Sequence, residues 1–279
     1  PQDAIAQIKK GVEFYRAHFG TDPKGMWPAE GAVAQEIVKM VSDAGLLWMA
    51  SDEEVLAKSI GLEGFTRDSK ETVQEADQLY RPYYVAHRNE RPVAIVFRDH
   101  VLSDKVGFVY SAMKGEEAAQ DFLDRLHAIE ARLKAQGAEG PHLVTVILDG
   151  ENAWEWYEND GKEFLHALYG KLSADKTIKT VTPSEYLALY PDQPRIERLW
   201  AGSWIGHDFS TWIGEDEENR AWDYLRRTRD MLAQYTLFKR KSAPQETIEK
   251  ALDLIYAAEG SDCCLLYTSD AADEGLGVD

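Results

Sequence analysis

Strand-like apolar runs alternate with amphipathic helical segments over residues 1–200, and this order constrains the fold more than any other feature of the sequence. Residues 2–19 place apolar side chains at helical spacing. The runs at 46–51 and 142–150 are strand-like, and the β-branched residues of HLVTVILDG (142–150) are typical of a strand buried on both faces. Because strands and helices alternate, we predict an α/β fold with a parallel sheet, open or closed into a barrel.

The same patterns divide the chain into regions. Further strands are predicted at 24–30, where the strand runs into a turn, and at 79–86, 92–99 and within 178–187. Further helices are predicted at 31–44, 52–61 with Asp52 as its cap, 111–137, 161–172, 183–189, 216–239 and 244–258. From about residue 216 the alternation stops and only helical patterns follow. We therefore predict a partial (β/α) barrel over 1–205 and a helical region over 206–262.

The last segment, CCLLYTSDAADEGLGVD (263–279), shares no periodicity with the helix before it. It resembles translated sequencing-adapter sequence, so we expect a non-native tail and leave it out of the fold argument. The alternative is a native disordered C-terminus. Both cysteines of the chain, Cys263 and Cys264, belong to this tail, which excludes a disulfide framework and a cysteine metal site from the rest.

The formal net charge of -18 bears on the partners of the chain. Phosphate binding needs a basic face, so nucleic acid and an anionic membrane surface are disfavoured, whereas a neutral substrate is compatible. No apolar run approaches the length of a transmembrane helix. No leader-like segment opens the sequence at Pro1, and the expected location is the cytoplasm. No feature predicts an oligomeric state.

Acidic side chains follow three of the strand-like runs. Glu30 follows KGMWPA, Asp99 follows VAIVFR, and Asp149 follows HLVTVIL. Catalytic groups of a parallel barrel gather where strands end, and cleavage of a glycosidic bond commonly needs two carboxyl groups, a nucleophile and an acid. Glu151 and Asn152 would support Asp149 by hydrogen bonding, or would cap the helix that follows. A helix cap or loop residue is the ordinary alternative for each acid.

Two motifs resemble those of glycoside hydrolase family 57. GMWPAEGAV (25–33) resembles the family motif that carries the nucleophile, and LDGENAWEWY (148–157) resembles the motif that carries the acid/base aspartate, in the same order. Other segments are similar to the amylopullulanase-like branch of the family: ASDEEVL (50–56), YRPY (80–83), FRDHVLSDKVGFVY (97–110) and LWAGSWIGHDFSTWIGEDEENRAW (199–222).

The resemblance implies an incomplete (β/α)7-type barrel followed by a helical region, of which this chain would be a fragment lacking both ends. It implies that Glu30 is the nucleophile and Asp149 the general acid/base of a retaining enzyme, which hydrolyses or transfers α-1,4 or α-1,6 glucosidic links. The implied partner is an α-glucan or a maltooligosaccharide. No cofactor and no metal are implied.

Aromatic and polar residues near these motifs are candidates for substrate binding. Apolar sugar faces stack on aromatic rings, whereas sugar hydroxyls need hydrogen-bonding neighbours. The candidates are Trp27, Arg98, Asp99, His100, Trp154, Trp204, His207 and, less strongly, Trp212. Core packing is the alternative for the tryptophans, and a structural salt bridge is the alternative for Asp99. Trp156 and Trp222 are expected in the core.

Two other functions remain open from the sequence. A metal-dependent carbohydrate deacetylase would use Asp99, His100 and His207 as zinc ligands, although no tightly spaced histidine pair is present. A glucan-binding module would keep the cleft without turnover. The presence of both Glu30 and Asp149 argues against a loss of activity by mutation.

Overall fold

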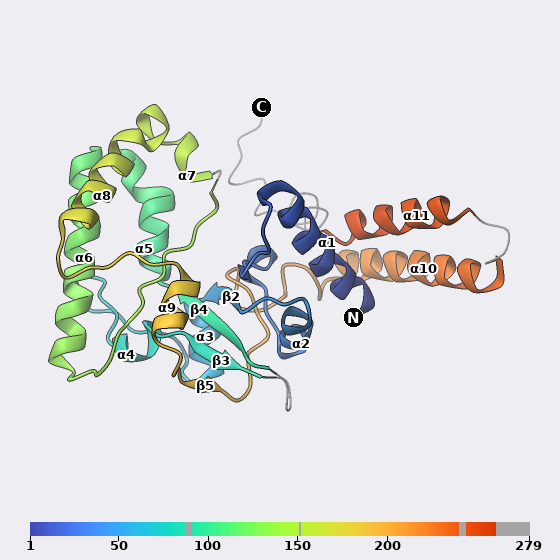
Figure 1. Cartoon of the computed structure of the whole chain (residues 1–279), viewed down its shortest axis with the longest axis horizontal. Helices are drawn as coiled ribbons and strands as arrows, with labels where there is room; N and C mark the ends of the chain where they lie inside the picture. Colours follow the sequence, from blue (N-terminus) through green and yellow to red (C-terminus); the bar gives the residue numbers. More distant parts are fainter. Residues whose placement is uncertain (87–90, 151, 240–243, 261–279) are drawn as a thin grey trace.

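The computed structural model describes residues 1–86, 91–150, 152–239 and 244–260, which contain a central five-stranded sheet (Figure 1). The strands lie in the order β1-β2-β4-β3-β5. Their bounds are Gly25–Met26 (β1), Trp48–Asp52 (β2), Tyr83–Val85 (β3), Val93–Arg98 (β4) and Arg195–Ile196 (β5). β1, β2 and β4 run parallel to one another, and β3 runs parallel to β5. The predicted α/β class with a mainly parallel sheet is therefore confirmed.

One pair of strands departs from the parallel arrangement. β3 and β4 pair antiparallel, with Tyr83 opposite Ile95 and Val85 opposite Val93. Only residues 86–92 join these two strands, whereas a parallel pair needs a crossover of about a dozen residues or more. The short connection therefore dictates the antiparallel pair.

The strand predicted at 142–150 does not form, and its apolar side chains are half-buried. β4 pairs with β2 on one edge and with β3 on the other, so it offers no free edge to another strand. Single hydrogen bonds instead hold the segment beside the carboxyl end of β4. The backbone N–H of Asp99 donates to the carbonyl of Thr145 (2.9 Å), and that of Ile147 donates to Ser103 Oγ (3.1 Å).

Helices form close to most of the predicted ranges. Their bounds are α1 (Gln2–Phe19), α2 (Gln35–Asp43), α3 (Glu53–Ser59), α4 (Ala76–Leu79), α5 (His100–Asp104), α6 (Gly115–Ala135), α7 (Asn152–Glu155), α8 (Lys162–Ala174), α9 (Pro183–Leu189), α10 (Asp216–Lys239) and α11 (Gln245–Ala258), with short turns η1 (Ala29–Gly31), η2 (Lys105–Val109), η3 (Tyr110–Ala112) and η4 (Glu158–Gly161). The Asp52 carboxylate caps α3 by accepting from Glu54 N at 3.1 Å. Thr182 and Glu185 form a capping box that starts α9, so the strand predicted within 178–187 is absent.

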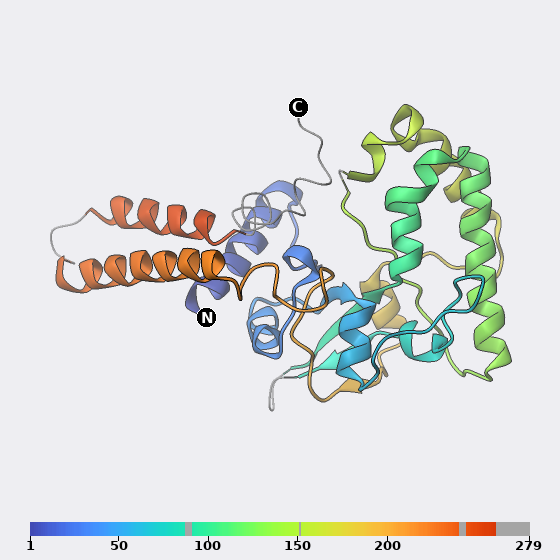
Figure 2. The ribbon, with the colours of Figure 1, turned by 180° about the vertical axis from the view of Figure 1, so that it is seen from behind.

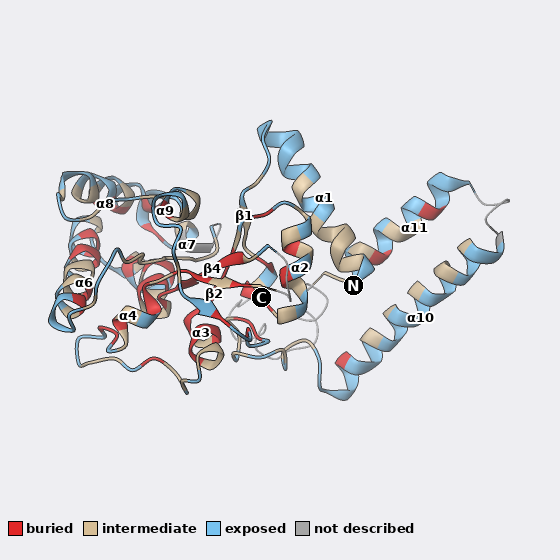
Figure 3. Cartoon of the chain, turned by 60° about the horizontal axis from the view of Figure 1, so that its bottom comes forward, coloured by how far each residue is buried: buried red, intermediate tan, exposed pale blue. Residues whose placement is uncertain are grey.

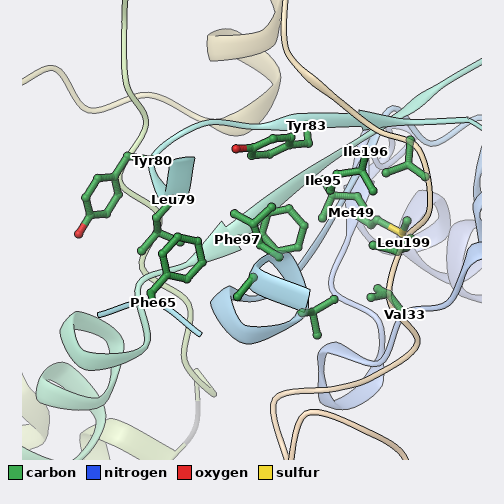
Figure 4. Close-up of a cluster of buried hydrophobic side chains, with 14 of the residues drawn as sticks. Val33, Met49, Phe65, Leu79, Tyr80, Tyr83, Ile95, Phe97, Ile196 and Leu199 are labelled. Atoms are coloured by element: carbon green, nitrogen blue, oxygen red, sulfur yellow. The ribbon is translucent and has the colours of Figure 1, made fainter. Parts of the chain in front are cut away.

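Two clusters of buried apolar side chains form the core. The larger one covers the sheet, and Figure 4 shows that Val33, Met49, Ile95, Phe97 and Leu199 meet there from segments far apart in the sequence. The smaller cluster joins α5, α6 and α8. Trp156 was expected in the core but is 70% exposed, because α7 ends at Glu155 and Trp156 lies on the turn that follows.

The helices α10 and α11 lie side by side and project away from the sheet (Figures 1 and 2). Most of α10 is exposed, as Figure 3 shows. A forked ion pair between Arg229 and Asp3, with N–O distances of 2.8 to 3.0 Å, ties α10 to α1. The boundary of the helical region at residue 206 stays a prediction.

A glycine at the start of α6 allows the close packing of α6 on α8. A Cβ atom at Gly115 would lie 2.6 Å from the backbone N of Phe164, which cannot swing aside as a side chain can. We expect Gly115→Ala to lower the free energy of unfolding by about 1–3 kcal/mol through overpacking. Urea denaturation measures this change.

Gly170→Ala is the matched control within α8. A Cβ atom at Gly170 would meet nothing within 4 Å, and alanine is favoured over glycine inside a helix by about 0.5–1 kcal/mol. We therefore expect this variant to be more stable than the parent chain. Equal stability of the two variants would contradict the close packing at Gly115.

Candidate active site around Trp204

Glu30 lies in the η1 turn that follows β1. Its backbone is left-handed, with φ 56° and ψ 23°. This conformation costs a residue other than glycine on the order of 1–3 kcal/mol and persists where its surroundings over-determine it. Two hydrogen bonds hold the turn: Trp204 N donates to the Glu30 carbonyl (3.2 Å), and Ser51 Oγ donates to the Gly31 carbonyl (2.7 Å).

Trp204 reaches Glu30 across 174 positions of sequence. The loop after β5 pairs with the segment after η1 through two backbone hydrogen bonds between Val33 and Gly202, of 2.8 and 3.0 Å. The Nε1 atom of Trp204 then donates to Glu30 Oε2 at 2.6 Å. The ring of Trp27 meets the Trp204 ring edge-to-face, with centroids 4.9 Å apart. The Glu30 carboxylate is thus held by an indole from a distant segment.

A pocket of about 230 Å³ lies against the same indole. Its lining combines apolar and ionisable side chains: Arg98, Ser103, Asp104, Gly107, Phe108, Leu148, Asp149, Trp204 and Ile205. Asp149 and Trp204 therefore share one pocket, and Trp204 in turn holds Glu30. Trp204 therefore connects the two predicted catalytic residues, because it binds the Glu30 carboxylate and lines the same pocket as Asp149.

An ion pair at the ends of two neighbouring strands lies beside this pocket, and its Arg98 lines the pocket. Asp52 and Arg98 lie opposite each other in the register of β2 and β4, and Arg98 Nε donates to Asp52 Oδ2 at 2.6 Å. Arg98 also contacts Asp104 (3.3 Å) and the Nδ1 atom of His100 (3.0 Å). Burial opposes ionisation of Asp52, but His100 and Arg98 together lower its pKa. The structure thus brings Arg98 and His100 into one charged cluster beside the pocket.

Asp99 belongs to a different cluster and does not line this pocket. Its carboxylate accepts hydrogen bonds from Tyr80 Oη (2.6 Å), from Arg67 (3.2 Å) and from the backbone N of Leu102 (2.9 Å). Arg67 also binds Glu53 through both carboxylate oxygens, at 2.5 and 2.7 Å. β4 ends at Arg98, whereas Asp99 is the N-cap of α5, so the two side chains join different clusters. Asp99 has the structural role that the sequence left open as its alternative.

The remaining predicted site residues lie elsewhere. Trp154 packs against the ring of Tyr157, at 5.4 Å, and against the smaller core cluster. The carbonyl of His207 accepts from Trp200 Nε1 (3.0 Å), and its buried Nδ1 has no hydrogen-bond partner in the described part of the chain. Glu151 and the side chain of Asn152 fall outside the described residues, so their support of Asp149 stays a prediction.

The sequence did not identify several residues that line the pocket or, like Asp52, bind a lining residue. Asp52 was interpreted as a helix cap, a role that it also fills. Asp104 lies one helical turn after His100, with a His100 Nε2–Asp104 Oδ2 distance of 2.9 Å, and this spacing was a usable signal. Phe108 is 73% exposed in η2, a π-helical turn, which often marks functional sites. No local pattern indicated Ser103 or Ile205.

The described residues contain neither a cluster of metal ligands nor a membrane-spanning helix. Across residues 1–86, 91–150, 152–239 and 244–260, no three His, Cys, Asp or Glu side chains form a group that could hold a metal ion. Asp99, His100 and His207 therefore do not form the zinc site that a deacetylase would need. No helix in these ranges is both long and apolar enough to span a bilayer.

Comparison with known sequences places residues 1–197 within the profile of glycosyl hydrolase family 57. A 1,4-alpha-glucan branching enzyme from Thermococcus kodakarensis is 24% identical over 334 aligned positions, which cover 96% of this chain and 48% of that enzyme. The chain thus spans about half the length of this curated relative.

Comparison of structures gives the same fold. The crystal structure of the Thermococcus branching enzyme, in complex with glucose, superposes with a TM-score of 0.70 at 20% identity, covering 98% of this chain and 60% of that one. The alpha-amylase AmyC from Thermotoga maritima gives a TM-score of 0.70 at 16% identity, with coverages of 98% and 60%. A branching enzyme from Pyrococcus horikoshii gives 0.72 at 17% identity, with coverages of 98% and 58%.

The histidine in the charged cluster makes stability depend on pH. Hydrogen bonds to Asp104 and Asp52 raise the pKa of His100 to about 10 in the folded chain, whereas an unfolded histidine titrates near about 6.5. Protonation of His100 therefore stabilises the fold fully below about pH 6.5, and this contribution is lost as the pH rises through about 10. We expect His100→Gln to flatten the fall in unfolding free energy across this window.

His18→Gln is the control, because it removes an exposed histidine near the end of α1. Denaturant titrations at several pH values measure both variants against the parent chain. If the parent and His100→Gln lose stability in parallel between pH 6.5 and pH 10, the ion pairs of His100 do not stabilise the fold.

Proposed function

Because the chain belongs to glycosyl hydrolase family 57, we propose that it carries the catalytic pair of a retaining enzyme that acts on α-glucans. Glu30 is the nucleophile, and Asp149 is the general acid/base. The observation that supports this proposal is the position of Trp204, which binds the Glu30 carboxylate and lines the same pocket as Asp149. In a retaining enzyme the two carboxyl groups lie on opposite sides of the scissile bond, about 5 Å apart.

The proposed reaction has two steps. In the first, Glu30 attacks the anomeric carbon and Asp149 protonates the leaving oxygen, which gives a glycosyl-enzyme. In the second, Asp149 removes a proton from the acceptor, which displaces Glu30 and restores the starting anomeric configuration. The bond from Trp204 occupies Glu30 Oε2 and orients Oε1 as the attacking atom.

The pocket wall suits a neutral sugar. Phe108, Leu148, Trp204 and Ile205 offer apolar surface, on which the apolar face of a glucose unit can stack, while the pocket's ionisable groups offer hydrogen bonds to hydroxyls. The net charge of -18 favours an uncharged substrate over an anionic one. We propose action at α-1,4 links, as the names of two similar proteins suggest, and extend the proposal to α-1,6 links.

The acceptor decides which activity results. Water gives an amylase, whereas a sugar hydroxyl gives a glucanotransferase or a branching enzyme. All three kinds occur among the similar proteins, which include a 4-alpha-glucanotransferase from Thermococcus litoralis. Product analysis with maltoheptaose separates them, because hydrolysis gives only shorter chains and transfer gives longer or branched ones.

Substitution of either carboxylate tests the proposed roles. We expect Glu30→Gln to lower kcat on maltoheptaose by more than about 1,000-fold, because the nucleophile is lost. Asp149→Asn should lower kcat by about 100- to 10,000-fold, because the general acid is lost. Proton NMR of the first products should show retained anomeric configuration.

Glu36→Gln is the control, since Glu36 is an exposed carboxylate on α2. Its activity should equal that of the parent chain. Turnover that survives in Glu30→Gln, or products of inverted configuration, would refute the assignment of Glu30 as nucleophile.

Phe108 provides a second test, aimed at binding. Its exposed ring lines the pocket and is available for stacking. We expect Phe108→Ala to raise KM for maltoheptaose about 3- to 10-fold, which corresponds to a stacking energy of roughly 1 kcal/mol. Phe14→Ala, which removes an equally exposed ring from α1, should leave KM unchanged. Equal KM values for the two variants would exclude Phe108 from the binding site.

A further inference from the structure

Three segments meet at Trp204 in a chain of polar and cation–π contacts. The Arg98 guanidinium from the end of β4 lies over the indole, with Cζ 4.8 Å from the ring centroid. The indole Nε1 donates to Glu30 Oε2 at 2.6 Å. A second bond joins the backbones, from Trp204 N to the Glu30 carbonyl at 3.2 Å. Trp204 therefore binds Glu30 with both its ring and its main chain.

Arg98 is held rigidly where it contacts the ring. Its side chain is 7% exposed, and Asp52 binds Nε at 2.6 Å. The remaining nitrogens contact His100 Nδ1 (3.0 Å) and the carbonyl of Ile147 (3.4 Å). The carboxylates of Asp52 and Asp104 offset the charge of Arg98 at longer range. Arg98 therefore acts on Glu30 through the indole that it contacts.

A cation over an indole face attracts the electrons of the ring. The N–H at the ring edge then becomes a stronger donor, because linked interactions polarise one another in a low-dielectric site. A bond from such a donor to a carboxylate is charge-assisted and therefore strong. It acts on the Glu30 oxygen that is not attacking, so it orients the carboxylate.

We propose that Trp204 is the positioning residue for Glu30, and that Arg98 acts on Glu30 through the indole of Trp204. The role in turnover rests on the proposed function, whereas the contact itself does not. The left-handed backbone of Glu30 agrees with this assignment, because an unfavourable conformation persists only where neighbouring groups fix it.

The chain contains a matched comparison at Trp200. Lys58 Nζ lies 5.4 Å from the centroid of the Trp200 ring, and Trp200 Nε1 donates to the carbonyl of His207 at 3.0 Å. Trp200 therefore combines a cation on its face with a hydrogen bond at its edge, but its acceptor is a neutral carbonyl. It shows how an indole behaves without the carboxylate.

The first experiment detects the hydrogen bond between Trp204 and Glu30 in the absence of substrate. The indole N–H signals in ¹H–¹⁵N spectra of the whole chain are assigned with Trp204→Phe and Trp200→Phe. We expect the Trp204 signal to lie downfield of the Trp200 signal and to move as the carboxylate is protonated at low pH. Glu30→Gln should abolish that movement. A Trp204 signal that is independent of pH, or unchanged in Glu30→Gln, would overturn the proposal.

The effect of Arg98 on Trp204 is tested with a double variant, because removing Arg98 alone would leave the buried Asp52 carboxylate without its partner. Asp52→Asn together with Arg98→Met removes both charges and keeps an N-cap for α3, which favours a folded product. We expect the Trp204 signal to move upfield in this double variant, while the Trp200 signal stays in place. An unchanged Trp204 signal in the folded double variant would remove Arg98 from the proposal.

The second experiment reads turnover. Trp204→Phe keeps an aromatic ring for Arg98 and Trp27 but lacks the N–H. We expect its kcat on maltoheptaose to fall about 10- to 100-fold, the size of one lost charge-assisted hydrogen bond, with little change in KM. Trp200→Phe should leave kcat unchanged. A kcat for Trp204→Phe within twofold of the parent value would contradict the positioning role.

The two proposals can fail separately. If Glu30→Gln keeps its turnover, the proposed function fails, although the indole signal can still report the contact with Glu30. If Glu30→Gln is inactive and Trp204→Phe is fully active, the function stands and the positioning role fails.

Discussion

The ion pair between Asp52 and Arg98 is the interaction on which the site depends. Asp52 is the last residue of β2, Arg98 is the last residue of β4, and the two lie opposite each other in these parallel strands. Both side chains are almost completely buried. A buried charge that loses its partner destabilises a fold strongly, so the pair fixes how β2 and β4 end. The guanidinium of Arg98, fixed by this pair, contacts two other segments. It lies over the ring of Trp204, and it donates to the carbonyl of Ile147, two residues before Asp149. One arginine thus links the sheet to the indole and to the acidic loop.

Local features of the fold could be predicted from the sequence because they depend on neighbouring residues. The helices, the cap at Asp52 and the turn at Glu30 follow from periodicity, capping chemistry and a short motif. The family resemblance named Glu30 and Asp149; in the structure Trp204 binds Glu30 and lines the same pocket as Asp149. Their catalytic roles stay proposals.

Features that depend on strand order or on distant contacts could not be predicted in this way. The run at 142–150 has the composition of a strand, but β4 has no free edge to pair with it. Arg98 and Asp99 were both candidates for substrate binding, but Asp99 caps α5 and binds Tyr80 and Arg67 from distant segments. The contact between Trp204 and Glu30 spans 174 positions, and its reach depends on the bridge between Val33 and Gly202.

The left-handed backbone at Glu30 has a consequence for how this position can evolve. Glycine adopts such a conformation without steric penalty, so it would suit the turn better than glutamate does. Selection for thermal stability alone would therefore favour glycine over glutamate at position 30, whereas selection for the proposed catalytic activity would keep the glutamate. A gain in stability at position 30 would therefore cost the carboxylate that Trp204 binds. Glu30→Gly, chosen for stability alone, would remove the group on which the proposed function depends.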